Sequence, residues 1–67
     1  MTIDYGTLLR MRREELGLSQ IAVADRAVVH RTTVIKAEQG RGLTLDVFLS
    51  LLQALNLKME VVEADGR

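Results

Sequence analysis

The sequence predicts an all-α bundle of four to five short helices, followed by a short C-terminal β-strand that pairs across a homodimer. Aliphatic side chains recur at helical spacing in four segments. Asp4, Ser19 and Thr44 stand where three of these segments could begin, and Gly17, Gly40 and Asn56 stand where three of them could end. No Pro interrupts them, and 67 residues leave room for a single domain covering residues 1–67.

The composition narrows the possible functions. The chain has no Cys and one His, so we expect neither a disulfide nor a metal site, and no cofactor. No nucleophile, base and acid are grouped as an enzyme would need, so we expect no catalytic activity. The N-terminus lacks the apolar run of a signal peptide, and no segment approaches the ~20 apolar residues of a membrane span. A cytoplasmic protein is therefore expected.

Charge is unevenly distributed although the net charge is zero. Residues 1–42 carry seven basic and five acidic side chains, a balance of +2, whereas residues 43–67 carry two and four, a balance of −2. A basic half of this kind suits an anionic partner such as nucleic acid. Two ordinary solvated surfaces remain the alternative.

Three predicted helices cover, in order, residues 4–16, residues from the N-cap Ser19 to about Ala27, and residues from His30 or Arg31 to Glu38 or Gln39. Asp4 is expected to cap the first helix, because a side-chain oxygen satisfies the free N–H groups of a first turn. Gly17 and Gly40 are expected to end the first and third helices.

The fourth helix is expected to run from the N-cap Thr44 to about Leu55, with two apolar faces. One face consists of Leu45, Phe48, Leu49, Leu52 and Leu55, and the other of Val47, Leu51 and Ala54. A helix this apolar is covered on more than one side. The rest of the chain offers little to cover both faces, so we expect a second subunit against one of them.

Residues 57–63 alternate between apolar and polar side chains, which predicts a strand. No other segment is expected to be a strand, whereas a second copy can pair with it antiparallel across a two-fold axis. Residues 44–63 would then form the dimerisation helix and strand, with an interface of Val47, Leu51, Leu57, Met59 and Val61. A frayed or helical tail is the alternative.

Residues 19–38 predict two short helices joined by a tight turn. Apolar positions hold the pair together: Val23, Ala24, Ala27, Val29, Val34 and Ala37. The second helix keeps its polar side chains outside, namely Arg31, Thr32, Thr33 and Lys36. One such helix fits the major groove of DNA, so this arrangement predicts a DNA-binding helix-turn-helix. A similar bundle used only for protein contacts is the alternative.

Two runs carry a resemblance to the lambda-repressor-like, or Xre, family. Leu16-Gly17-Leu18-Ser19-Gln20 resembles the start of the family's motif, and Arg31-Thr32-Thr33-Val34-Ile35-Lys36-Ala37-Glu38-Gln39-Gly40 resembles its recognition helix. The resemblance covers about residues 8–56. It implies a helix-turn-helix bundle that binds double-stranded DNA.

The resemblance also implies roles for individual side chains. Those expected to face base edges are Arg31, Thr32 and Lys36. Those expected near phosphates are Gln20, His30, Thr33 and Arg41, with Gln20 also bracing the recognition helix. Arg13 and Glu38 match a structural salt bridge between the first and third helices. For His30 this position near phosphate is favoured over a pH switch.

Two positions depart from the family pattern. Val28 occupies the turn position usually held by Gly, where φ is commonly positive and a β-branched side chain is resisted. We therefore expect either a remodelled turn or strain of about 1–3 kcal/mol. Ile21 stands where a polar residue is usual, which suggests an exposed side chain or part of an interface.

The run Leu51-Leu52-Gln53-Ala54-Leu55-Asn56-Leu57-Lys58-Met59-Glu60-Val61-Val62 resembles the end of HipB-type antitoxins, whose short strand pairs across a dimer. This resemblance implies a homodimeric repressor of its own operon, acting on a palindromic operator, with a HipA-type kinase toxin as partner. The alternatives are a stand-alone repressor of phage, mobile-element or restriction-modification type, and a protein-interaction module that does not bind DNA.

Overall fold

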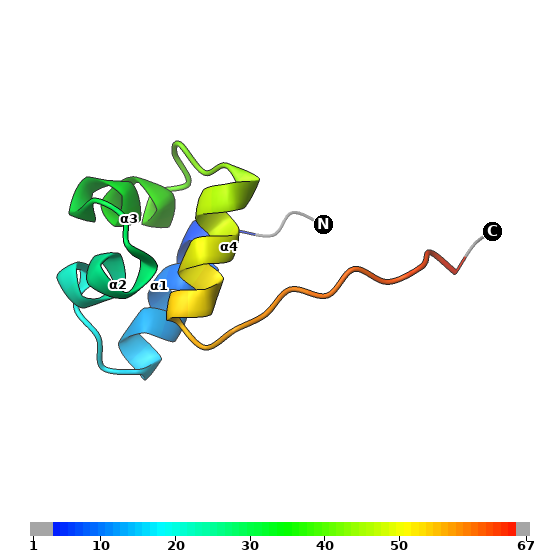
Figure 1. Cartoon of the computed structure of the whole chain (residues 1–67), viewed down its shortest axis with the longest axis horizontal. Coiled ribbons are helices and arrows are strands. Elements are labelled where there is room, and N and C mark those ends of the chain that lie inside the picture. Colours follow the sequence, from blue (N-terminus) through cyan, green and yellow to red (C-terminus); the bar gives the residue numbers. More distant parts are fainter. Residues whose placement is uncertain (1–3, 66–67) are drawn as a thin grey trace.

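A computed structural model describes residues 4–65 of the chain, which contain four helices. α1 covers Tyr5–Glu15, α2 Gln20–Ala27, α3 Arg31–Glu38 and α4 Leu45–Ala54. α2 and α3 lie side by side on one side of the bundle, and α1 and α4 form the other side (Figure 1). Each helix begins and ends within a residue or two of its predicted limits.

N-cap side chains begin the helices as the sequence predicts. Each accepts a hydrogen bond from a first-turn backbone N–H: Asp4 from Thr7 (3.0 Å), Ser19 from Ala22 (3.0 Å) and Thr44 from Val47 (3.2 Å). These bonds satisfy N–H groups that have no partner within the helix. The limits of the helices are thus set by side chains next to them in the sequence.

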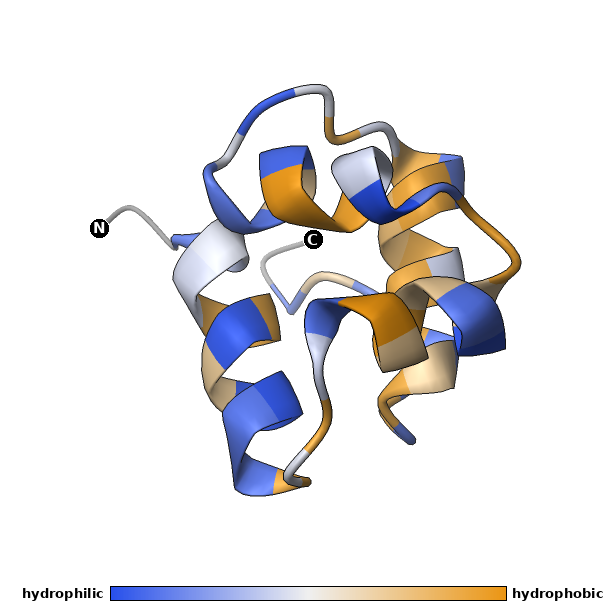
Figure 2. Ribbon diagram, turned by 90° about the vertical axis from the view of Figure 1, so that its left-hand side faces the viewer, coloured by the Kyte–Doolittle hydropathy of each residue, from blue (hydrophilic) through white to orange (hydrophobic). Residues whose placement is uncertain are grey.

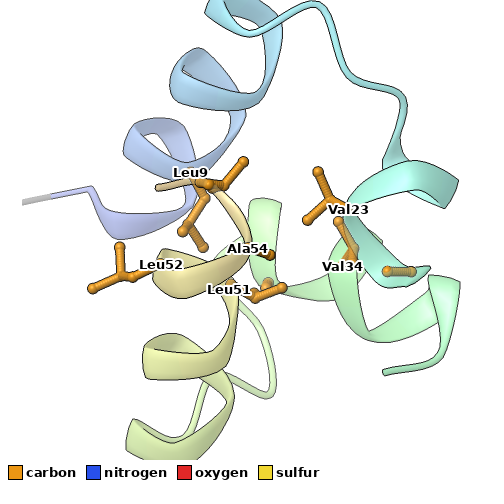
Figure 3. Packing of buried hydrophobic residues seen from close by; sticks show 9 residues of the cluster. Leu9, Val23, Val34, Leu51, Leu52 and Ala54 are labelled. Atoms are coloured by element: carbon orange, nitrogen blue, oxygen red, sulfur yellow. The ribbon is translucent and has the colours of Figure 1, made fainter. Parts of the chain in front are cut away.

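The core is entirely aliphatic. Its buried members come from all four helices and the residue after α4, and they are Leu9, Val23, Ala24, Val34, Ala37, Leu51, Leu52, Ala54 and Leu55 (Figure 3). Figure 2 shows that α4 is mostly hydrophobic, whereas much of α1 is hydrophilic. Burial of this cluster holds α2 and α3 against the α1–α4 side and so fixes the motif of residues 19–38.

The packing of α4 corrects one expectation. Leu51, predicted at a dimer interface, is 1% exposed and belongs to the chain's own core. Val47 on the same face packs against this core, so no second subunit is needed there. Leu45 and Leu49, which belong to the other apolar face, are exposed at the N-terminal half of the helix. Both faces are apolar, so the sequence pattern could not distinguish them.

α1 and α3 approach unusually closely at Gly6. A Cβ atom added to this residue would lie 2.5 Å from the carbonyl oxygen of Glu38 and 2.9 Å from that of Ala37. Both are backbone atoms of the last turn of α3, so they cannot turn aside as a side chain could. Only glycine fits at this crossing, and it brings the first turn of α1 against the end of α3.

The C-terminal tail is extended and runs from the end of α4 away from the helices (Figure 1). Leu57 packs against the core, but Val61 and Val62 are 92% and 79% exposed. The described part of this single chain contains no β-strand, so the predicted strand and its pairing across a dimer stay predictions. None of the helices within residues 4–65 is long and apolar enough to cross a membrane.

Candidate nucleic-acid interface

α3 presents a polar outer face. Val34 and Ala37 point into the core and are each 1% exposed. The opposite side carries the exposed side chains of Arg31, Thr32 and Lys36, and all three were predicted to face base edges. Thr33, predicted near phosphate, is half-buried. Residues 4–65 contain two ion pairs, Arg12–Glu15 and Arg13–Glu38. Neither involves Arg31 or Lys36, so both cations of this face are without an acidic partner there.

The end of α3 is fixed by the ion pair between Arg13 and Glu38. Arg13 Nε donates to Glu38 Oε2 at 2.6 Å, and Arg13 Nη2 donates to Oε1 at 3.1 Å. The same guanidinium donates from Nη1 to the backbone oxygen of Leu18 at 3.0 Å. Hydrogen bonding to Glu38 raises the pKa of Arg13 above its ordinary value. One side chain of α1 therefore holds both α3 and the loop that leads into α2.

Gln20 adds a third helix to this junction. As the first residue of α2, it donates from Nε2 to Glu38 Oε1 at 3.2 Å. Its amide therefore braces α3 as expected, while its predicted contact with phosphate stays a prediction. α1, α2 and α3 meet at one carboxylate, so α3 cannot rotate about its axis without breaking these bonds.

His30 begins α3 as its N-cap. Its ring nitrogen Nδ1 accepts from the backbone N–H of Thr32 at 3.3 Å and also lies 2.9 Å from the Thr32 hydroxyl. The ring is exposed, in keeping with a position near phosphate. Sequence reasoning missed its link to Thr32, because His is not among the residues that usually cap helices.

The turn between α2 and α3 contains the strain expected at Val28. This residue has φ 57° and ψ 47°, in the left-handed region, and its side chain is 89% exposed. The turn keeps its left-handed residue and is not remodelled to suit valine. The chain closes α2 here, since the N–H of Val29 donates to the Ala24 oxygen at 3.0 Å. Ile21, the other departure, is exposed.

Arg41 lies just beyond α3, as predicted, and is held by a partner that the sequence did not indicate. Its Nε donates to Gln39 Oε1 at 3.1 Å, and its Nη2 donates to the same oxygen. Its backbone N–H also donates to the Lys36 oxygen at 2.8 Å, across the left-handed Gly40. Gln39 thus fixes where the Arg41 charge stands beside the exposed face of α3.

Two further arginines act at the end of α4. Arg12 Nε donates to the backbone oxygen of Leu55 at 3.0 Å, and Arg26 Nη1 lies 3.5 Å from that of Ala54. The last turn of α4 has no basic residue of its own, and cations near a helix C-terminus are stabilising. Arg12 stands among apolar positions of α1, a pattern that could have indicated a structural arginine.

Comparison with known proteins gives the same motif. A family model described as helix-turn-helix matches residues 9–62. An uncharacterized HTH-type transcriptional regulator of Methanothermobacter thermautotrophicus is 51% identical over 35 residues, which are 52% of this chain. The match covers 51% of that protein, so the chain spans about half the length of the curated relative.

Two solved structures have the same arrangement of helices. The restriction-modification controller protein C.AhdI from Aeromonas hydrophila superposes with a TM-score of 0.77 at 33% identity, covering 84% of this chain and 86% of that one. HipB, in a HipB-O1-O2 complex, superposes with a TM-score of 0.79 at 21% identity, covering 94% and 96%. The second likeness concerns the fold alone. With these matches and the geometry around α2 and α3, the chain is a member of the helix-turn-helix family of the lambda-repressor-like, or Xre, type.

Proposed function

We propose that this protein is a sequence-specific DNA-binding transcription regulator that represses by placing α3 in the major groove. One observation carries the proposal: a helix with Arg31, Thr32 and Lys36 on its outer face is held rigidly at its end by Arg13 and Gln20. The major groove admits one α-helix, and Arg and Lys can donate to guanine O6 and N7 there. Membership of the helix-turn-helix family supports the same function.

Positioning and reading are divided between two groups of side chains. Arg31, Lys36 and Thr32 read base edges, whereas Arg41 and Thr33 contact the phosphate backbone at the margins of the same face. Phosphate contacts set the register of a protein on the duplex, and base contacts specify the sequence. Arg41 suits a phosphate contact because Gln39 holds its guanidinium in place beside α3.

Binding to DNA is tested with duplexes enriched from a random library by the full chain. Affinity should fall steeply with salt, with a logarithmic slope of about −0.9 per neutralised phosphate. Arg31→Ala or Lys36→Ala should cost about 1–3 kcal/mol and relax base preference at one position, whereas Arg41→Ala should weaken all duplexes alike and lower the slope by about 1. Failure to enrich any duplex would remove the function and favour a protein-interaction module instead.

The protein acts as a homodimer on a palindromic operator. An open hollow of about 280 Å³ beside α4 is lined by apolar Tyr5, Leu43, Leu45, Phe48 and Met59, together with Thr44. The exposed Val61 and Val62 continue from it along the tail. Antiparallel pairing of two such tails would satisfy their backbone groups and cover these side chains. Half-sites should then lie about 34–36 Å apart.

Dimerisation is tested by placing charges on the exposed tail. Val61→Lys with Val62→Lys changes nothing in the core of the single chain, so the helices should stay folded by circular dichroism. Sedimentation should show a dimer for the unaltered chain and a monomer for the variant. Glu60→Lys with Glu63→Lys is the matched control and should remain dimeric. A dimeric double-valine variant would contradict pairing through the tail.

Two physiological settings are compatible with a repressor. Similarity to C.AhdI, at 33% identity over most of both chains, favours a stand-alone regulator such as a restriction-modification controller. The tail resemblance to HipB-type antitoxins favours a partner of a HipA-type kinase toxin. A kinase-like neighbouring gene whose product co-purifies with this chain would support the antitoxin. A methyltransferase or nuclease gene there would support the controller.

A protein-interaction module is the remaining candidate, from a different functional class. The exposed apolar tail and the hollow lined by Phe48 and Met59 are the observations in its favour. It predicts that the purified chain shows no salt-dependent affinity for any DNA. The enrichment experiment above therefore separates it from both kinds of repressor.

A further inference from the structure

The hydroxyl of Thr32 is held by a side chain of its own helix terminus. Its Oγ1 lies 2.9 Å from His30 Nδ1, and the backbone N–H of Thr32 donates to the same nitrogen at 3.3 Å. We propose that His30 is a specificity-determining residue that fixes Thr32 as a hydrogen-bond acceptor toward DNA. This inference rests on the proposed function and specifies which hydrogen-bonding groups of the bases Thr32 recognises.

The direction of the hydrogen bonds follows from the cap. A backbone N–H can only donate, so the bond from Thr32 requires an unprotonated Nδ1 with its lone pair toward the helix. The imidazole is then the neutral tautomer with its proton on Nε2. Because Nδ1 cannot donate in this form, the Thr32 hydroxyl must donate its single proton to His30.

Because the Thr32 hydroxyl donates its proton to His30, it can only accept hydrogen bonds from bases in the major groove. In the major groove the hydrogen-bond donors are the exocyclic amines, N6 of adenine and N4 of cytosine. Guanine and thymine present oxygen acceptors, which a proton-poor Thr32 cannot satisfy. The pair therefore favours adenine or cytosine over guanine or thymine at one position of each half-site.

This role differs from a contact between His30 and phosphate. A phosphate contact positions the protein without regard to sequence, so its loss weakens every duplex alike. Loss of a residue that orients Thr32 changes the ranking of bases at one position. The two roles are separated by measuring base preference as well as affinity.

The experiment is a double-mutant cycle on the duplex enriched by the unaltered full chain. Its variants are His30→Ala, which releases the hydroxyl, Thr32→Val, which removes it, and the double variant. His30→Asn is the matched control, because its amide oxygen can cap the helix and accept from Thr32 as Nδ1 does. Affinity is measured for all four bases at each position, and folding is checked by circular dichroism.

The unaltered chain and His30→Asn should prefer adenine or cytosine at one position. His30→Ala and Thr32→Val should each relax this preference by roughly 2- to 10-fold, the worth of one hydrogen bond. The double variant should relax it no further than Thr32→Val alone, because His30 acts through the hydroxyl. If adenine is preferred, replacing it with purine, which lacks N6, should cost the unaltered chain the same factor.

Uniform weakening by His30→Ala at every base, or additive effects in the double variant, would overturn the inference while leaving DNA binding intact. A preference for guanine or thymine at the position that Thr32→Val alters would also overturn it. Failure to enrich any duplex would overturn the proposed function itself, and this inference with it.

Discussion

Arg13 and Glu38 form a two-point contact, with Arg13 Nε and Nη2 lying 2.6 Å and 3.1 Å from the two carboxylate oxygens. Their side chains are 14% and 7% exposed, so the pair is largely shielded from water. It joins the last turn of the chain's first helix to the last residue of its third. The pair therefore acts on the angle at which α3 is presented as well as on stability.

Removal of Arg13 should destabilise the fold markedly. Arg13→Ala leaves the buried carboxylate of Glu38 with one weaker donor, Gln20, and should lower the free energy of unfolding by about 2–4 kcal/mol. Urea denaturation followed by circular dichroism measures this change. Glu15→Ala, which breaks the exposed pair with Arg12, is the control and should cost less than about 1 kcal/mol. Equal effects of the two substitutions would contradict a structural role for the buried pair.

The strained turn should be improved by a residue that tolerates positive φ. Val28→Gly removes a β-branched side chain from φ 57°, where it makes little packing because it is 89% exposed. Relief of strain should exceed the entropic cost of glycine, giving a gain of about 0.5–1 kcal/mol in unfolding free energy. Val61→Gly, on the extended tail, is the control and should give no gain. A loss of stability in Val28→Gly would show that the left-handed valine carries no strain.

Local features of the fold could be predicted from the sequence because they depend on neighbouring residues. A cap such as Ser19 and a positive-φ residue such as Asn56 act within one turn of the helix they limit. The inward positions Val23 and Val34 follow from helical spacing alone. The departure at Val28 was recognisable for the same reason, since a turn of this kind demands a particular backbone conformation.

Contacts between distant segments could be predicted less well from the sequence. Leu51 was assigned to a dimer because two apolar stripes on one helix look alike until a neighbouring helix covers one of them. The bond from Arg12 to the Leu55 oxygen spans 43 residues, so the apolar neighbours of Arg12 could indicate a structural arginine but not its partner. The link between His30 and Thr32 is local, but it depends on which ring nitrogen accepts. The strand predicted at residues 57–63 needs a second chain to pair with, so a single chain does not test it and it stays a prediction.

Gly6 should resist a substitution that ordinarily favours helices. Alanine has a higher helix propensity by about 1 kcal/mol, but its Cβ would lie 2.5 Å from the Glu38 oxygen. α1 and α3 must separate to admit it, so Gly6→Ala should lower the unfolding free energy by about 1–3 kcal/mol. Thermal and urea unfolding measure the change, with the exposed Arg10→Ala on the same helix as a control near zero. Stabilisation by Gly6→Ala would mean that the two helices do not cross this closely.

The pH dependence of stability should reveal the cap of α1. Hydrogen bonds from the Thr7 hydroxyl and then from its backbone N–H lower the pKa of Asp4 below its ordinary value of 3.8. A carboxyl whose pKa is lower in the folded state stabilises the fold above the unfolded pKa, and this stabilisation is lost as pH falls through the folded pKa. Asp4→Asn retains an oxygen that can cap the helix but does not titrate.

The loss of stability caused by Asp4→Asn should therefore be present near pH 6 and shrink below about pH 4. Urea midpoints of the unaltered chain and the variant at a series of pH values measure it. In a Thr7→Val background the hydroxyl that donates to Asp4 is absent while the backbone bond remains. The loss of stability caused by Asp4→Asn should then vary less with pH. A difference that stays constant on acidification would show that the charged carboxylate adds nothing beyond the amide. A variation undiminished by Thr7→Val would instead assign the effect to the backbone N–H groups at the start of α1.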